Sequence, residues 1–140
     1  MHDQRYGEGD TSYLTAGGEA GVQKLVEDFY EIMAERPFAK KIFEMHPKDI
    51  SVSIDKLARF LCGWLGGPKR YSEKYGGIAI PPAHKHLPIK EEEMNAWLGC
   101  MAEAIERQDY PEDFGQYLIE QLAVPASRIV LLRKKTEQLQ

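Results

Sequence analysis

The segment Phe60-Leu61-Cys62-Gly63-Trp64-Leu65-Gly66-Gly67-Pro68 decides the fold. Apolar residues in and before it recur every three or four positions, which is typical of one face of an amphipathic helix: Ile54, Leu57, Phe60, Leu61, Trp64 and Leu65. The two glycines and the proline end this helix, because glycine adopts left-handed backbone readily and proline cannot extend a helix. Ser51 or Ser53 is the expected N-terminal cap. The sequence therefore predicts a helix that stops abruptly before a loop.

The loop that follows, over residues 68–88, is rich in glycine and proline and allows at most a turn or two of helix. A loop of that length in a small domain is usually either functional or disordered. Two histidines near its end, His84 and His86, favour a function, although their spacing does not suggest a chelating pair. A single imidazole is sufficient to bind haem iron axially. The layout suits a flat apolar cofactor held between two helices.

The rest of the chain is expected to be helical as well. The expected helices, in chain order, are residues 18–35, 38–43, 51–65, 89–107 and a last one from residue 111 onward. Pro37 ends or bends the first of them, and Pro125 taken alone indicates a break or kink in the last. No alternating apolar run is bounded by hairpin turns, so the fold class is all-α.

Length and charge limit the function further. A chain of 140 residues fits one domain, here residues 18–140, preceded by a flexible N-terminal extension over residues 1–17. The net charge of −4, with no basic stripe, argues against nucleic acid as a partner. No signal peptide and no apolar run long enough to cross a bilayer is seen, so no membrane partner and a cytoplasmic location are expected. The cysteines, Cys62 and Cys100, are expected to be buried, reduced thiols.

Four signals at matching spacing resemble the group II truncated haemoglobins, over roughly residues 18–130. They are the pair Phe29-Tyr30, the helix that ends in Gly66-Gly67-Pro68, His84 seventeen positions after Gly67, and Trp97 thirteen positions after His84. The resemblance implies a globin-like, two-over-two helical sandwich enclosing haem b, iron protoporphyrin IX. It also implies that Pro125 lies inside one long last helix.

The resemblance assigns roles at the iron. His84 takes the place of the proximal, metal-binding histidine, although His86 competes for it because the family usually reads His-x-Pro-Phe-x-Ile there. Tyr30 and Trp97 take the places of the distal residues that donate hydrogen bonds to a bound diatomic ligand. The distal aromatic position of the preceding loop falls on Phe43 or His46, and the family pattern of an aromatic or histidine before proline favours His46.

The remaining haem contacts are expected on the distal helix and the loop. Ser53 and Leu57 lie over the iron, with Phe60 and Leu61 beside them, as the small residue and the apolar wall. The family often has arginine before the proximal histidine, but Ala83 stands there in this sequence. Propionate contacts are therefore left to a set of polar candidates: Lys69, Arg70, Tyr71, Lys85 and His86.

The implied function is reversible binding of dioxygen, nitric oxide and carbon monoxide. Two hydrogen-bond donors retain a bound ligand, which suits redox chemistry or sensing better than bulk oxygen transport. Nitric oxide dioxygenase and peroxidase-like activities, with peroxide as a further ligand and an unknown reductase, both remain open, as does a haem-based gas or redox sensor. The competing class is a haem-free helical interaction module, from which a haem absorption band distinguishes the first hypothesis.

Overall fold

The computed structural model describes residues 6–46, 48–76 and 90–138, and all regular secondary structure within these ranges is helical. This confirms the predicted all-α class. The elements in chain order are α1 (Thr11–Thr15), α2 (Gly18–Glu35), η1 (Pro37–Ala39), α3 (Lys40–Glu44), α4 (Ile50–Trp64), α5 (Arg70–Tyr75), α7 (Glu91–Glu106) and α8 (Glu112–Gln138).

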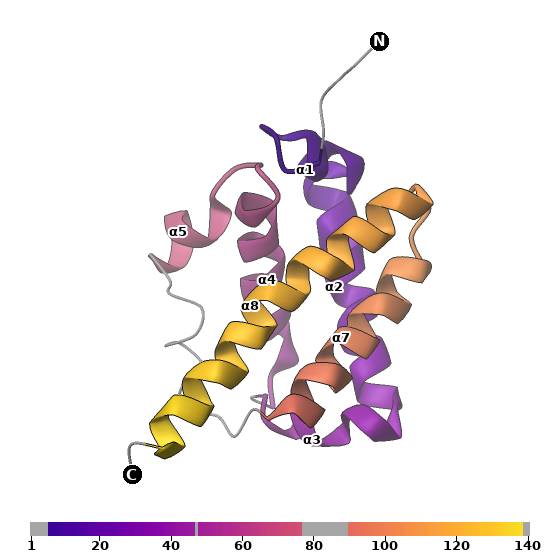
Figure 1. The fold of residues 1–140 in the computed structure, drawn as a ribbon. Helices are drawn as coiled ribbons and strands as arrows, with labels where there is room; N and C mark the ends of the chain where they lie inside the picture. Colours follow the sequence, from indigo (N-terminus) through magenta and orange to yellow (C-terminus); the bar gives the residue numbers. More distant parts are fainter. Residues whose placement is uncertain (1–5, 47, 77–89, 139–140) are drawn as a thin grey trace.

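The helices are arranged as two packed pairs. Helix α2 packs against both α4 and α7, and α7 packs against α8. Figure 1 shows α8 running across the molecule over α2 and α4, with α5 beyond the end of α4 and α3 at the opposite end. This is the two-over-two sandwich that the resemblance implies. None of the described helices is both long and apolar enough to cross a membrane.

Helix α2 supplies the centre of the core. Its apolar stripe is fully buried, and each such side chain contributes roughly 1.5 to 3 kcal/mol by leaving water; the stripe consists of Val22, Leu25, Val26, Phe29, Ile32 and Met33. The helix ends at Glu35 because Arg36 adopts extended backbone, as the residue before a proline prefers. The chain then turns through η1 into α3.

Helix α4 ends as predicted but begins differently. At its C-terminus Gly67 N donates to Cys62 O at 2.8 Å and Gly66 N donates to Gly63 O at 3.0 Å, the two bonds of a Schellman motif. Gly66 has φ +96°, and a Cβ there would lie 2.0 Å from Gly9 O, so glycine is required. The predicted cap is wrong: Asp49, not Ser51 or Ser53, caps the helix, accepting from Ser51 N at 3.1 Å.

The N-terminal segment from Tyr6 to Gly17 is packed on the domain, which differs from the expected flexible extension. It contains α1, and Ser12 and Ala16 are buried. The ring of Tyr6 lies against Phe114 with centroids 5.0 Å apart. Tyr13 N also donates to Leu65 O at 3.1 Å, which ties the segment to the end of α4. These contacts join distant parts of the chain and leave no local sequence pattern.

Helices α7 and α8 complete the second pair. Helix α8 continues through Pro125, as the resemblance implies, and its first half is anchored by buried Phe114, Leu118 and Leu122. In α7 the buried side includes Cys100 and, unexpectedly, Glu93. Cys100 and Cys62 of α4 are both free and buried, as predicted.

Candidate functional site

Tyr30 and His46 form a polar pair between α2 and the loop after α3. Tyr30 is only 7% exposed, and its hydroxyl lies 3.3 Å from His46 Nε2. The two rings meet edge to face, with centroids 5.2 Å apart at 86°. Burial raises the pKa of the Tyr30 hydroxyl well above its usual value, so the group keeps its proton and acts as a hydrogen-bond donor.

The second nitrogen of His46 fixes its tautomer. His46 Nδ1 lies 2.8 Å from the carbonyl oxygen of Ile42. A carbonyl only accepts, so Nδ1 must carry the proton and donate. In the neutral ring Nε2 then offers a lone pair, and the Tyr30 hydroxyl donates to it. The His46 imidazole therefore has a defined orientation, and it contacts Tyr30.

Phe29 connects this pair to Trp97. The ring of Phe29 is 5.0 Å from Tyr30 and 5.1 Å from Trp97, centroid to centroid, and both contacts are tilted towards edge-to-face geometry. Phe29 is fully buried, whereas Trp97 of α7 is half-buried. The three residues predicted as distal site residues, Tyr30, His46 and Trp97, thus lie along one row of aromatic rings.

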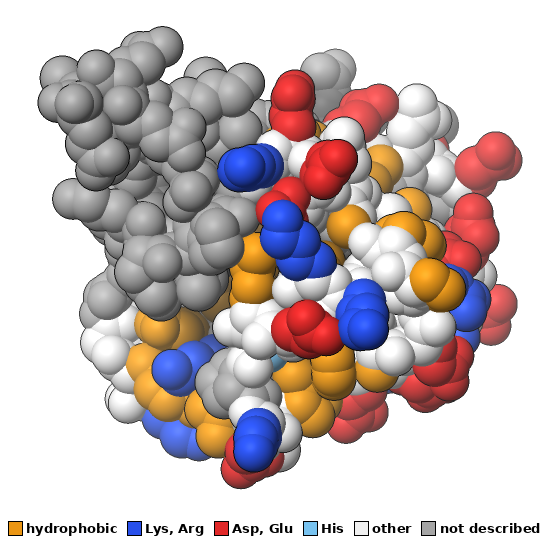
Figure 2. All heavy atoms as spheres, turned by 90° about the horizontal axis from the view of Figure 1, so that it is seen from below, with side chains coloured by type: hydrophobic (Ala, Val, Ile, Leu, Met, Phe, Trp, Pro, Cys, Tyr) orange, Lys and Arg blue, Asp and Glu red, His pale blue; other side chains and the backbone are white. Residues whose placement is uncertain are grey.

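The predicted apolar wall lies mainly on α4. Leu61 is buried. Phe43, Leu57 and Phe60 pack against the core and remain partly open, and Ser53 is partly exposed. Figure 2 views the α3 end of the molecule and shows hydrophobic side chains lying open between charged ones. Half-open apolar side chains suit a flat, largely apolar cofactor, so the described residues fit a haem group.

Helix α5 carries two of the residues predicted to contact the propionates. Tyr71 packs its ring on Phe60, with centroids 6.4 Å apart, while Lys69 precedes the helix and is exposed. Arg70, a further candidate, instead pairs with Glu19 at 3.0 Å. Its NH1 group also donates to the Cys62 sulfur at 3.6 Å. Lys69 and Tyr71 are therefore the better placed candidates among the described residues.

Asp55 ties α4 to α5. Its carboxylate accepts from Lys74 Nζ at 2.8 Å and from Arg59 Nε at 2.9 Å, and it also accepts from the Tyr75 hydroxyl. These donors, Lys74 first and then Tyr75, hold the pKa of the Asp55 carboxyl well below its usual range. This cluster was not predicted, because Lys74 and Tyr75 belong to α5, which lies within the segment predicted as a loop.

Three predicted site residues, His84, His86 and Lys85, lie outside the described residues. Their roles remain predictions. Sequence reasoning also missed Glu93, because an acid in the first turn of a helix commonly does no more than stabilise the helix dipole. Its helical spacing from Trp97, four positions on, is a signal that it shares a face with the site.

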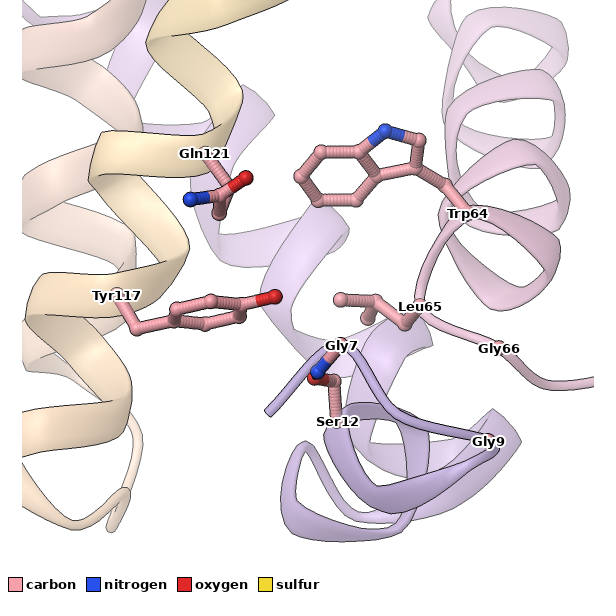
Figure 3. A pocket seen from close by; sticks show the side chains of 8 residues that line it. All are labelled: Gly7, Gly9, Ser12, Trp64, Leu65, Gly66, Tyr117 and Gln121. Atoms are coloured by element: carbon pink, nitrogen blue, oxygen red, sulfur yellow. The ribbon is translucent and has the colours of Figure 1, made fainter. Parts of the chain in front are cut away.

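A separate small cavity of about 190 Å³ lies between the N-terminal segment, the end of α4 and α8. Figure 3 shows the Tyr117 hydroxyl pointing towards Gly7 and Leu65, with Gln121 and Trp64 beside it. No predicted site residue is among the described residues that line it. The cavity is therefore distinct from the row of rings at Tyr30.

Known proteins resemble the chain over most of its length. A family model described as bacterial-like globin matches residues 11–129. Group 2 truncated hemoglobin YjbI of Bacillus subtilis (strain 168) is 34% identical over 113 residues, 81% of this chain and 83% of that protein. The cold-adapted truncated hemoglobin of Pseudoalteromonas haloplanktis TAC125 has a TM-score of 0.82 at 29% identity, covering 86% of this chain and 97% of that one. The group II truncated hemoglobin of Bacillus anthracis has a TM-score of 0.80 at 26% identity, covering 92% and 93%.

The chain belongs to the bacterial-like globin family, and its relatives confirm the predicted resemblance to group II truncated haemoglobins. Globins bind gases through haem. Membership therefore implies that this chain binds haem and a diatomic gas such as oxygen.

Proposed function

We propose that the chain binds haem b and uses Tyr30, His46 and Trp97 as the polar side of a site for dioxygen, nitric oxide and carbon monoxide. The observation that carries the proposal is the row of rings in which a buried hydroxyl meets His46 and a tryptophan lies one ring away. A plain aromatic core does not need a protonated tyrosine paired with an oriented imidazole.

The wall residues of α4 and α3 would hold the cofactor. Leu57, Phe60 and Leu61 would contact its flat face, with Phe43 and Ser53 at the side of the distal residues. Lys69 and Tyr71 would meet its propionates, together with His86 or Lys85, and the His84 imidazole would bind its iron. When bound, haem supplies an iron with one open coordination position for a diatomic ligand.

The distal residues supply hydrogen bonds. The Trp97 indole nitrogen can only donate, and the Tyr30 hydroxyl is kept protonated by its burial. Each bond from such a donor to a ligand carrying partial negative charge contributes about 1.5 to 3 kcal/mol. Slow ligand release follows, which suits nitric oxide dioxygenation or peroxidase-like chemistry, with electrons from a reductase, better than bulk oxygen transport.

Reconstitution with haem tests the proposal. We expect the purified chain to show a Soret band, and His84→Ala to lose tight haem binding or the histidine–iron stretch in resonance Raman spectra. His86→Ala, two positions away in the same loop, is the matched control and should keep both. No Soret band after reconstitution of the unaltered chain would refute the proposal, and exchanged behaviour of the two variants would move the axial ligand to His86.

A further inference from the structure

Glu93 is a buried carboxylate with an incomplete set of partners. It lies in the first turn of α7 and is only 3% exposed. Neither of its oxygens accepts a hydrogen bond from the described residues. Lys41 Nζ of α3 lies 3.1 Å from Oε1, within ion-pair distance but without the geometry of a directed hydrogen bond. Lys41 itself is an exposed residue, its side chain 62% accessible.

Stability alone does not account for this arrangement. Removing a carboxylate from water is costly, and a solvated lysine returns little of that cost. The positive end of the α7 dipole favours an acid in the first turn, but Glu91 and Glu92 already occupy that turn in water. Buried charges of this kind are retained in some proteins because they fix how two elements meet. Here the two elements are α3 and α7.

Helix α3 needs such a tie because it is short. It has five residues, too few to be stable without tertiary contacts. Ile42 holds it from the inside, being buried in the core. Lys41, the preceding residue, holds it from the outside through Glu93. The carbonyl of Ile42 is also the acceptor for His46 Nδ1, so the ion pair and the anchor of the imidazole lie on consecutive residues.

We propose that the Lys41–Glu93 ion pair is a positioning device: it holds α3 against α7 so that Ile42 keeps the His46 imidazole in the orientation that accepts the Tyr30 hydroxyl. Lys41 and Glu93 are thus positioning residues that act through His46. The relevance to gas binding rests on the proposed function, whereas the effect on His46 does not.

The tautomer of His46 is the direct readout. Long-range ¹H–¹⁵N NMR spectra distinguish the Nδ1–H from the Nε2–H imidazole, and they can be recorded on the diamagnetic ferrous carbon monoxide complex and on the haem-free chain. We expect the unaltered chain to show the Nδ1–H form. Lys41→Met and Glu93→Gln should both lose this signature, whereas Lys41→Arg should keep it because the cation remains.

Lys40→Met is the matched control, since it removes a neighbouring exposed lysine of the same helix. It should leave the tautomer unchanged.

Oxygen release should slow in Lys41→Met, because a Tyr30 hydroxyl that no longer donates to His46 is free to donate to the ligand. An unchanged His46 tautomer in both Lys41→Met and Glu93→Gln would overturn the proposal, as would an equal change in Lys40→Met. If the unaltered chain takes up no haem, the proposed function fails, but the haem-free spectra still decide the role of the ion pair.

Discussion

Tyr30 has one hydroxyl proton and two groups that compete for it. In the structure that proton goes to His46 Nε2, and a bound ligand in the proposed site would offer a second acceptor. Trp97 differs, because its indole N–H cannot accept and its ring meets only the apolar Phe29 in this row. We therefore expect the hydrogen bond from Trp97 to a bound ligand to be formed more consistently than the one from Tyr30.

Trp97→Phe should accelerate oxygen release about ten- to hundredfold, since a hydrogen bond worth about 1.5 to 3 kcal/mol is lost while most of the apolar bulk is kept. Stopped-flow measurement of oxygen dissociation tests this. Trp64→Phe is the control, because Trp64 is also half-buried but lines the separate cavity. Adding Tyr30→Phe to Trp97→Phe should release oxygen faster still, with a smaller effect on carbon monoxide. Oxygen dissociation at the same rate in all variants would mean that Tyr30 and Trp97 contribute only packing and do not donate hydrogen bonds to the ligand.

The residue types of this row were predictable, but their contacts were not. The resemblance assigned Tyr30 and Trp97 to the distal side, and a His-Pro pattern favoured His46 over Phe43. That Phe29 would separate the tyrosine from the tryptophan depends on how α2 and α7 cross, which a one-dimensional pattern does not specify. Ion pairing across helices is hidden in the same way, so the pairing of Glu93 with Lys41 was not predicted.

At the level of elements, Asp55 joins α4 to α5 and should make stability depend on pH. Its pKa is lowered in the folded chain, so its contribution is present above the unfolded value of about 3.9 and is lost as the pH falls below that value. Asp55→Asn should cost on the order of 1 kcal/mol near neutral pH, given partial exposure. The difference from the unaltered chain should shrink below about pH 4.

Urea unfolding at neutral and acidic pH measures this difference. Glu73→Gln is the control. Glu73 is an exposed acid of α5 beside Lys74 in sequence, but Lys74 pairs with the carboxylate of Asp55. If Asp55→Asn lowers the free energy of unfolding by the same amount at both pH values, the ion pairs of Asp55 do not cause the loss of stability.

Elements with a strong apolar period were predicted closely, and those without one were not. The predicted helix over 18–35 has those bounds in the structure, because a long buried stripe and Pro37 define it. Helix α1 was missed since its five residues contribute one buried side chain, Ser12, and are held by contacts with distant residues. The cap of α4 was misplaced by two or more residues because aspartate and serine compete for that role near any helix start.

At the level of the whole molecule, the N-terminal segment closes one end of the sandwich. Tyr6→Ala should lower the free energy of unfolding by about 1 kcal/mol, because its ring contacts both Phe114 and Tyr117 and its hydroxyl donates to Asp113 at 3.1 Å. Leu14→Ala is the control, since Leu14 is 62% exposed and should change stability little. Thermal unfolding of the two variants makes the comparison, and equal losses would mean that the segment is not held through Tyr6.

The class of fold was predictable from the whole chain because four separate signals had to agree in spacing. The attachment of the segment from Tyr6 to Gly17 was not, since it depends on the lack of side chains at Gly66 and Gly67, which lets Gly9 and Tyr13 approach closely. In the sequence those glycines indicate a helix end. Only the folded structure shows that they also contact the segment from Tyr6 to Gly17.

The burial of both cysteines bears on how the protein would withstand the reactive ligands proposed for it. Nitric oxide and peroxide modify thiols that they can reach as thiolate, and burial raises the pKa of the Cys100 thiol to about 11. Cys62 lies on α4 and Cys100 on α7, and each is fully covered, so neither is open to attack until the packing around it opens. The rates at which the two cysteines are alkylated, followed by mass spectrometry, would therefore report separately how often the packing opens around α4 and around α7.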